Sequence, residues 1–418
     1  MAIEKDTCFT SFDVLIPKGQ YVASWPVIAC DQFTSQPEYW EEVRSAVGDS
    51  PSALHCILPE AELSRSGEET YSAIRKHMKE YLQSSVFREC RDSFIFVERT
   101  LQDGSIRAGV VGMVDLEQYD YHRYASSPVR ATERTVEERI PPRMQIRRGA
   151  PLELSHVLLL CDDARDRLFA FLRARKDELE PVYDLELPMG GGRLRGYLVD
   201  GAVRDAFQEQ LALYREDRVR AADGEPPLLY VVGDGNHSLA SAKACYEELK
   251  QNHAGAEALR HARYAMAELE NLRDCVSHIE PIHRILQETD PEAVLRFLQE
   301  RCGADDAAQA DPVHWKAGDR EGVLYLHRVK GQVPAGVLQD GLDAYIAAYG
   351  GSVDYIHGGG TLSALAGKDR TIGFLLPEIS AERLFADISA GGVLPRKTFS
   401  IGTAREKRYY MEARRLQP

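Results

Sequence analysis

Several patterns that would assign this chain to a class at once are missing. Its eight cysteines are scattered without a C-x-x-C spacing, which favours reduced thiols over a disulfide framework or a cysteine-ligated zinc site. No apolar run approaches the roughly 20 residues that span a bilayer. The N-terminal stretch lacks the basic segment and apolar core of a signal peptide. We therefore expect a protein of the cytoplasm with no membrane partner.

An excess of positive charge is missing as well. The chain carries 51 Lys and Arg against 65 Asp and Glu, a formal net charge of -14, which argues against a general affinity for nucleic-acid phosphates. Walker A, H-E-x-x-H and EF-hand spacings do not occur. We therefore expect a small-molecule substrate, and no nucleic acid, as the partner; the oligomeric state is left open.

The sequence does contain a regular alternation of short apolar runs and amphipathic stretches. Its 418 residues are 44% hydrophobic, enough for two or three domains with sizeable cores. The alternation predicts an α/β to α+β fold, in which mixed sheets are flanked by helices. We place the domain boundaries at 1–125, 126–285 and 286–418, where no Pro- or Gly-rich linker marks them.

Individual elements follow from the same patterns. Residues 94–100 and 106–114 flank an Asp-Gly turn and predict a hairpin. A second hairpin is expected from 182–187 and 193–199. Helices are predicted at 38–47, 164–179, 202–216, 291–301, 337–349 and 381–389, and further strands at 25–30, 156–161, 323–329 and 371–376.

The most informative stretch, LLYVVGDGNHSLASAKACYEE, occupies residues 228–248. Five apolar residues predict a buried strand, and apolar residues from Leu239 onward recur at helical spacing. Gly233-Asp234-Gly235 lies between the two and predicts a turn that leads directly into the helix. The free N–H groups and the positive dipole end of a helix favour an anion, such as a phosphate, above such a turn.

Two other interpretations of this turn compete with a phosphate site. Gly233-x-Gly235-x-x-Ser238 nearly matches the dinucleotide fingerprint, and Glu257 lies about 20 residues further on. Against it, Ser238 replaces the third glycine, and Asp234 and His237 add bulk and charge to a turn that should be bare backbone. Alternatively, Asp234 only caps the helix and His237 is a polar residue on its first turn.

The chemistry of Asp234 separates these interpretations in part. A carboxylate at an anion-binding turn repels a phosphate unless a divalent cation lies between them or the carboxylate accepts a proton from the reacting group. Asp234 beside His237 therefore favours a site that acts on a phosphate over one that only holds it.

Two further segments carry polar candidates. Arg130 to Thr135 offers a guanidinium and hydroxyls, including that of Thr132, for phosphate oxygens, or it is a solvated helix start capped by Thr132. His357-Gly358-Gly359-Gly360 is similar to the oxyanion loop of esterases, but no G-x-S-x-G nucleophile elbow accompanies it. We interpret this second segment as a glycine-rich turn.

At residues 234–238 the sequence resembles a known family. A strand followed by D-G-H-H-R and a helix marks the bacterial and archaeal proteins grouped as domain of unknown function 1015, and the motif here reads Asp234-Gly235-Asn236-His237-Ser238. The resemblance extends over nearly the whole chain. It includes VIACDQFTSQPEYW, VRATERTVEERIPPR, SHIEPIHRIL and a C-terminal segment that begins GFLLPEISAERLF. The chain is identified as a member of this family.

The family motif is in turn similar to the phosphate-binding turn of the ParB/sulfiredoxin-like fold, which includes the free serine kinases. This resemblance implies a nucleotide-binding module and an enzyme that transfers a phosphoryl group to a small-molecule hydroxyl, with free L-serine as the first candidate. ATP or ADP with magnesium are the implied cofactors. Two alternatives stay open: a non-catalytic regulator that binds a nucleotide or metabolite, and a structural or interaction protein in which the motif is only a capped turn.

The resemblance also suggests roles for single residues. His237, Asp234 and Glu133 are the expected catalytic residues: His237 donates a hydrogen bond to the transferring group and Glu133 orients the acceptor hydroxyl. Asp234 or Asp31 is the expected magnesium ligand. Because Ser238 stands where relatives have Arg, an arginine or lysine contact to phosphate must come from elsewhere. The expected phosphate-binding set is Gly233, Gly235, Asn236, Ser238, Arg130, Thr132 and Lys243, with Arg396 and Lys397 as further candidates.

Overall fold

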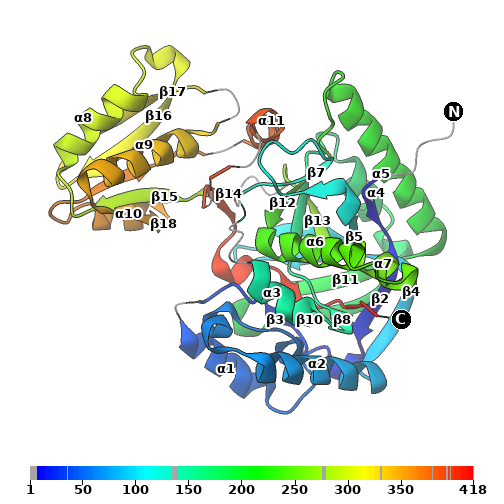
Figure 1. Cartoon of the computed structure of the whole chain (residues 1–418). Coiled ribbons are helices and arrows are strands. Elements are labelled where there is room, and N and C mark those ends of the chain that lie inside the picture. Colours follow the sequence, from blue (N-terminus) through cyan, green and yellow to red (C-terminus); the bar gives the residue numbers. More distant parts are fainter. Residues whose placement is uncertain are drawn as a thin grey trace.

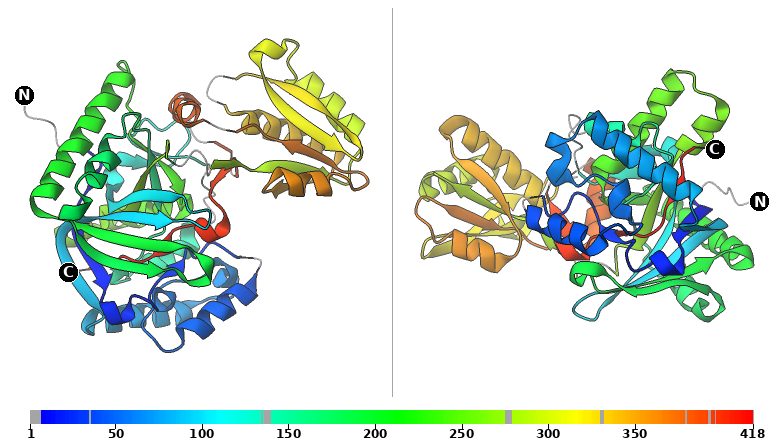
Figure 2. Two further views of the ribbon diagram at one scale, coloured as in Figure 1. Left: turned by 180° about the vertical axis from the view of Figure 1, so that it is seen from behind. Right: turned by 90° about the horizontal axis from the view of Figure 1, so that it is seen from below.

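The computed structural model describes residues 7–34, 36–133, 135, 140–274, 279–329, 332–378, 380–391, 394–395 and 397–417. They form a large body and a smaller body that stands beside it (Figure 1). The chain builds most of the large body first, then the smaller one, and its last segment returns to the large body (Figure 2). The fold is mixed α/β with sheets flanked by helices, as the sequence predicts.

An eleven-stranded mixed sheet is the frame of the large body. It takes strands from both predicted regions, 1–125 and 126–285. Its order is β10 (Glu180–Glu186), β11 (Arg193–Val199), β4 (Phe87–Thr100), β5 (Ile106–Asp115), β13 (Tyr264–Asn271), β9 (Leu158–Cys161), β12 (Tyr230–Asp234), β7 (Val129–Ala131) and β6 (Tyr119–Asp120), while β1 (Phe9–Thr10) pairs with β5 and β2 (Phe12–Pro17) with β4.

Both faces of this sheet are buried. Along β4, Phe94 and Phe96 pack into one hydrophobic cluster, whereas Ile95 and Val97 pack into another, because successive side chains of a strand point to opposite faces. The first face is covered by α4 (Arg167–Arg173), α5 (Gly201–Ala221), α6 (Asn236–Gln251) and α7 (Ala256–Ala262). The second is covered by α1 (Pro37–Val47). Beside α1 lies α2 (Glu68–Gln83), and beside α6 lies α3 (Ile140–Arg147) (Figure 1).

The smaller body is a five-stranded antiparallel sheet with helices on both faces. Its strand order is β17 (Arg320–His327), β16 (Ala310–Ala317), β19 (Ile372–Leu375), β15 (His283–Gln287) and β18 (Ser352–Ile356). Residues of α8 (Pro291–Cys302) and α9 (Pro334–Tyr349) pack with Phe374 on one face, and Leu362 of α10 (Gly359–Leu365) packs with Ile285 on the other.

The C-terminal part of the chain ties the two bodies together. Side chains of α11 (Ala381–Gly391) belong to a hydrophobic cluster that also contains Val231 of β12 and Phe374 of β19. Three short strand pairs then follow: β20 (Phe399–Ile401) with β14 (Ile279–Pro281), β21 (Tyr409–Tyr410) with β3 (Val27–Ile28), and β22 (Arg414–Arg415) with β8 (Leu152–Glu153). Residues from the end of the sequence therefore lie beside residues from its beginning.

Most predicted elements are present, with some corrections. The strand, turn and helix around residue 235 and both hairpins are confirmed. The helix expected at 164–179 is limited to α4, and the strand expected at 25–30 to β3. The segment interpreted as a glycine-rich turn instead begins α10 at Gly359, because Gly358 takes a φ of +79° and only then does the chain turn helical. None of the described helices is long and apolar enough to cross a membrane.

Candidate functional site

The turn between β12 and α6 depends on two glycines. Gly235 has a φ of +75°, a backbone conformation that L side chains rarely adopt, and a Cβ there would lie 3.1 Å from the Val157 Cα. A Cβ on Gly233 would lie 2.8 Å from side-chain atoms of Leu160 and Ile401. With both glycines in place, β12 leads straight into the first turn of α6, whose early N–H groups lack intrahelical acceptors.

The described residues around this turn enclose a polar pocket, which we call the turn pocket. Gly233 to Ser238 form one wall of it. Two predicted residues from elsewhere in the chain, Asp31 and Glu133, also line it. The structure thus brings the three expected carboxylates, Asp31, Glu133 and Asp234, together with His237. The remaining lining residues are Cys30, Glu60, Arg143, His156, Lys397, Phe399, Ser400 and Lys407.

Asp234 forms an ion pair with a lysine from the C-terminal segment. The Nζ of Lys407 lies 3.3 Å from the Oδ2 of Asp234 and donates to the Ser400 hydroxyl at 3.1 Å. The Gly235 N–H donates to the other carboxylate oxygen at 2.9 Å. Burial works to raise the pKa of Asp234, but Lys407, His156 and the Gly235 N–H together lower it below its usual value. Asp234 is therefore a carboxylate, and its charge is balanced before any ligand binds.

His156 is a buried member of the site that the sequence does not reveal. It lies just before β9, and only 5% of it is exposed. Its Nδ1 lies 2.7 Å from the Tyr410 hydroxyl, and its Nε2 lies 3.2 Å from the Ser238 Oγ and 3.7 Å from the Asp31 Oδ2. Burial opposes the charged imidazolium, but Asp31, the Cys30 thiol and Asp234 outweigh it and raise the pKa of His156 to about 9.

Glu133 lines the turn pocket beside the C-terminal segment. Its backbone forms a bridge to Leu394, and its Oε1 accepts from the Lys397 N–H at 2.9 Å. Burial is the main cause that raises the pKa of Glu133 to about 7, and Asp234 raises it further against the Lys397 N–H and Lys407. A carboxyl group with this pKa exchanges protons near neutral pH, as a general base must.

Three expected phosphate ligands lie outside the turn pocket. Arg130 is buried on β7 and donates to the carbonyl oxygens of Ser127 and Pro226 at 2.8 and 3.2 Å. The Thr132 hydroxyl donates to the Val232 carbonyl at 2.6 Å. Lys243 donates to the Leu116 carbonyl at 2.8 Å. The polar groups of all three hold the protein's own backbone.

Asn236 has a similar structural use, although it lines the pocket. Its Nδ2 donates to the Thr132 Oγ1 at 3.2 Å, and its Oδ1 accepts from the Thr132 N–H at 3.3 Å. This pair fixes the start of α6 to the segment after β7.

Of the further candidates, Lys397 lines the pocket, with its Nζ 4.8 Å from the ring centroid of Tyr355 in the smaller body. Arg396 and Arg134 lie outside the described residues.

The pocket residues missed by sequence reasoning had weak local signals. His156 begins a predicted strand, where a lone histidine is usually a satisfied core residue, and Lys407 lies in a C-terminal run of charged residues. His156 reaches the turn because β9, which follows it, pairs with β12. Lys407 reaches it because β20 and β21, which flank it in the sequence, pair with β14 and β3. Long-range strand pairing of this kind leaves no periodic pattern in the sequence.

The pocket can hold a magnesium ion only together with a ligand. Among the described residues, no group of three or more His, Cys, Asp or Glu is arranged for a metal. Asp31 and Asp234 nevertheless both face the pocket. Magnesium is commonly bound through one or two carboxylates plus substrate phosphates. The donor set of the turn pocket fits this arrangement, with the phosphates supplied by a nucleotide.

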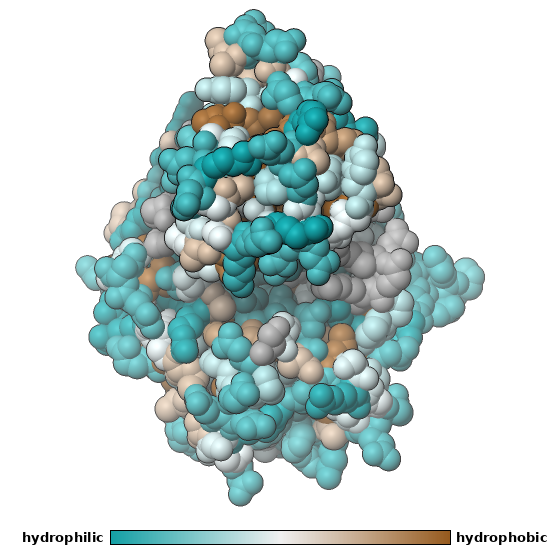
Figure 3. Space-filling view, turned by 90° about the vertical axis from the view of Figure 1, so that its left-hand side faces the viewer, coloured by the Kyte–Doolittle hydropathy of each residue, from teal (hydrophilic) through white to brown (hydrophobic). Residues whose placement is uncertain are grey.

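The face of the molecule on the side of the smaller body is mainly hydrophilic, and a recess divides this face into an upper and a lower part (Figure 3).

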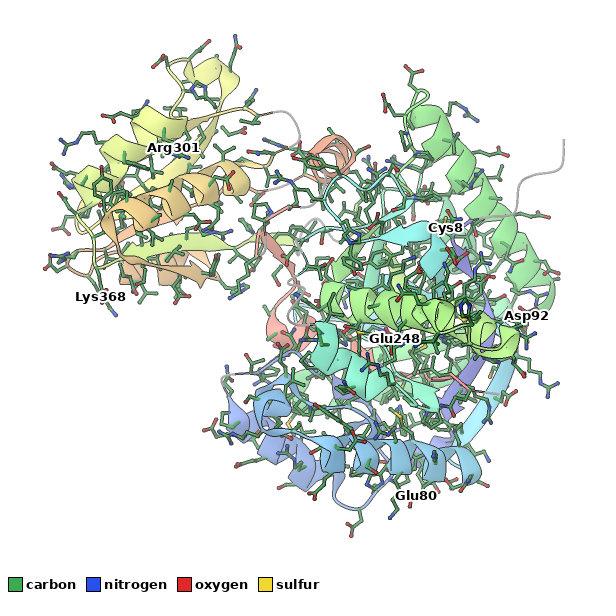
Figure 4. All side chains as sticks on the ribbon, viewed as in Figure 1. Cys8, Glu80, Asp92, Glu248, Arg301 and Lys368 are labelled. Carbon is green, nitrogen blue, oxygen red and sulfur yellow. The ribbon has the colours of Figure 1, made fainter. Side chains whose placement is uncertain are left out.

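The helices α3 and α6 lie against each other. Figure 4 shows Glu248 projecting from α6 near α3, where it accepts from Arg148 at 2.7 Å. The helix α6 is thus held at its start by Thr132 and near its end by Arg148.

Comparison with known proteins gives one strong match. The model of the family described as "Protein of unknown function (DUF1015)" matches residues 12–349. A search of curated proteins found no match. The family match covers most of the chain, from the start of β2 to the end of α9.

Solved structures give weaker likenesses. A conserved hypothetical protein from Pyrococcus furiosus is 10% identical over 73% of this chain and 94% of that chain, with a TM-score of 0.33. A variant of a free serine kinase in complex with ADP is 10% identical over 71% and 86%, with a TM-score of 0.35. C-terminally truncated SbnI from Staphylococcus aureus is 12% identical over 69% and 81%, with a TM-score of 0.35.

Proposed function

The chain belongs to the DUF1015 family of proteins of unknown function. From the turn pocket we propose that it transfers a phosphoryl group from a nucleotide to the hydroxyl of a small molecule. One observation carries the proposal: Asp31, Glu133, Asp234 and His237 line one pocket at the N-terminus of α6, together with the partly buried ammonium of Lys407. The pocket thus combines a place for phosphates with groups that can move a proton.

The phosphates bind at the start of α6. The N–H groups of the first turn and the helix dipole attract anions, and Lys407 adds a positive charge beside them. This lysine takes the place of the arginine that the family motif has at position 238. We further propose that β12, Gly235 and α6 form a phosphate-binding turn of the ParB/sulfiredoxin-like kind. His237, on the first turn, donates a hydrogen bond to the transferring phosphoryl group.

Glu133 acts on the acceptor. The acceptor hydroxyl oxygen forms a bond to the terminal phosphorus of the nucleotide, the bond from that phosphorus to the bridging oxygen breaks, and the shortened nucleotide leaves with the bond's electrons. Glu133 takes the hydroxyl proton. Its pKa of about 7 allows it to be a carboxylate when the acceptor binds and to hold a proton afterwards.

Asp31 and Asp234 would hold magnesium when the nucleotide is bound. The ion would neutralise charge on the phosphates, which is the main task in phosphoryl transfer. His156 positions Asp31 and Ser238, because its Nε2 lies near both side chains and its Nδ1 is held by Tyr410. Cys30, whose N–H lies 3.2 Å from the same tyrosine hydroxyl, completes this support.

The test is turnover of nucleotide by the purified full chain. ATP and ADP, each with magnesium, are incubated with free L-serine as the first acceptor, and phosphorylated acceptor and shortened nucleotide are measured together. Equal amounts of both products over many turnovers support the proposal. Nucleotide binding without turnover in a broad acceptor screen would favour a regulatory protein instead, and no binding of any nucleotide would favour a structural role.

A further inference from the structure

A second cavity adjoins the turn pocket, and we call it the apolar chamber. Five residues line both spaces and form the partition between them: Cys30, Glu60, Arg143, His156 and Ser238. The partition includes the ion pair between the Arg143 Nη2 and the Glu60 Oε2, 2.9 Å apart. A molecule whose reacting end lies in the turn pocket can therefore extend past this ion pair into the chamber.

The chamber has a different chemistry from the turn pocket. Its lining is mainly aliphatic and comes from helices on both sides, with Leu58, Leu63, Met78, Ile146 and Leu239 among its residues. The rings among its described lining residues are those of His156 and Tyr410, and these two hydrogen-bond to each other. A nucleobase needs hydrogen-bond partners for its edge and gains from stacking on aromatic faces. The lining suits an aliphatic group better.

Charged side chains also line the chamber: Glu60 and Arg143 at the partition, and Arg147 and Glu153 beyond it. Arg147 lies one helical turn beyond Arg143 on α3, and it lines the chamber but not the turn pocket. Its Nη1 pairs with the Glu153 Oε1 at 2.5 Å. Its Nη2 is buried, and none of the described residues accepts a hydrogen bond from it. A buried N–H donor without an acceptor costs free energy, so a ligand that supplies an acceptor there is favoured.

We propose that the apolar chamber binds the aliphatic body of the phosphoryl acceptor, and that Arg147 binds a carboxylate at its far end. The acceptor is then a hydroxy acid whose hydroxyl and carboxylate are separated by several methylene groups. This inference rests on the proposed function, because the hydroxyl end must lie in the turn pocket. Because Arg147 lines the chamber and Glu133 lines the turn pocket, this acceptor is longer than free serine.

The test uses a series of linear hydroxy acids and the full chain. Binding of 3-hydroxypropanoate, 6-hydroxyhexanoate and 8-hydroxyoctanoate is measured by calorimetry without nucleotide, with hexane-1,6-diol as the probe that lacks the carboxylate. Affinity should rise about fourfold per methylene as the chamber fills. The 6-hydroxyhexanoate should bind about tenfold more tightly than the diol, the scale of a hydrogen bond to a charged group.

Three variants assign this binding to the chamber. Arg147→Met should remove the preference for the acid over the diol, and Arg147→Lys, which retains a positive charge for Glu153, should keep part of it. Leu63→Trp should remove the dependence on chain length by filling the chamber. Arg148→Met is the matched control, because Arg148 pairs with Glu248 and lines neither cavity. It should bind the series as wild type does.

The outcomes separate this inference from the proposed function. A wild-type protein that phosphorylates serine but shows no dependence on chain length overturns the hydroxy-acid inference and leaves the proposed function standing. An equal loss of binding in Arg147→Met and Arg148→Met also overturns the inference. A protein that binds the series with the expected dependence but turns over no nucleotide contradicts the proposed function, and the chamber remains a site for hydroxy acids.

Discussion

The Nζ of Lys407 lies 3.3 Å from the Oδ2 of Asp234. These two residues are far apart in the sequence, and their ion pair makes the turn between β12 and α6 compatible with an anion. Without it, the partly buried carboxylate of Asp234 would repel a phosphate at the helix N-terminus. In the proposed function, Lys407 supplies the cationic contact that Ser238, in place of the family's arginine, cannot make.

Replacing Lys407 should weaken nucleotide binding. Lys407→Met leaves Asp234 without its cation, so the pKa of Asp234 should rise and the affinity for magnesium-ATP should fall at least tenfold. Calorimetric titration with magnesium-ATP measures this change. Lys250→Met on α6 is the control, because Lys250 pairs with Glu117 away from the pocket. Equal affinities in Lys407→Met and wild type would remove Lys407 from the binding site.

His237→Ala should lower turnover by roughly one hundredfold or more, the scale of a lost donor to a charged transition state. Because His237 is partly exposed on the first turn of α6, the midpoint of thermal unfolding should change little. Steady-state rates with saturating nucleotide measure the effect. His327→Ala, on an exposed position of β17 in the smaller body, should retain full activity. An unchanged rate in His237→Ala would exclude the proposed role.

Activity should depend on the ionisation of Glu133. Burial raises the pKa of this carboxyl to about 7, and the base is its deprotonated form, so kcat should increase as the pH rises through about 7 and decrease below it. Glu133→Gln should abolish most activity and remove this rise. A pH profile of the residual rate tests the assignment, and an identical ascending limb in wild type and Glu133→Gln would assign it to another group.

Thr132 should affect stability and not binding. Its hydroxyl donates to the Val232 carbonyl and accepts from Asn236, and the residue is fully buried. Thr132→Val leaves those partners unsatisfied and should lower the free energy of unfolding by about 1–3 kcal/mol. Urea denaturation measures the loss, and Thr132→Ser, which keeps the hydroxyl, should lose less. A larger effect on nucleotide affinity than on stability would restore Thr132 as a phosphate ligand.

The turn itself can be tested by comparing two glycines. Gly235→Ala combines a positive φ with a close approach to the Val157 backbone, whereas Gly224, at a φ of +89°, has nothing within 4 Å of the position of a Cβ. Gly235→Ala and Gly224→Ala should each lower the free energy of unfolding by about 1 kcal/mol, because both put a side chain on a residue with a positive φ. Gly235→Ala should lower it by at least another 1 kcal/mol because of the close approach. Equal losses in urea denaturation would show that the turn relaxes around the new methyl group.

Some of the fold follows from local patterns and some does not. The hairpin of β4 and β5 was predicted because an Asp-Gly turn between two apolar runs is a local signal. By contrast, no strand was predicted at β13, whose sequence YAMAELEN is rich in strong helix formers. It is a strand because its neighbours β5 and β9 complete its hydrogen bonds. Its buried Glu268 and Glu270 pair with Arg408 and Arg107 at 2.9 and 2.8 Å.

The sequence by itself determined the strand, the glycine turn and the helix around Gly235, because apolar periodicity and glycine turns act over a few residues. It also indicated Asp31, Glu133, Asp234 and His237, which the structure brings to one pocket. Only the tertiary structure decided that His156 and Lys407 complete that pocket and that Arg130, Thr132 and Lys243 bind the protein's own backbone. Those contacts depend on segments that are far apart in the sequence and lie side by side in the central sheet or in the C-terminal strand pairs, and no local pattern of residues specifies which distant segments will pack together.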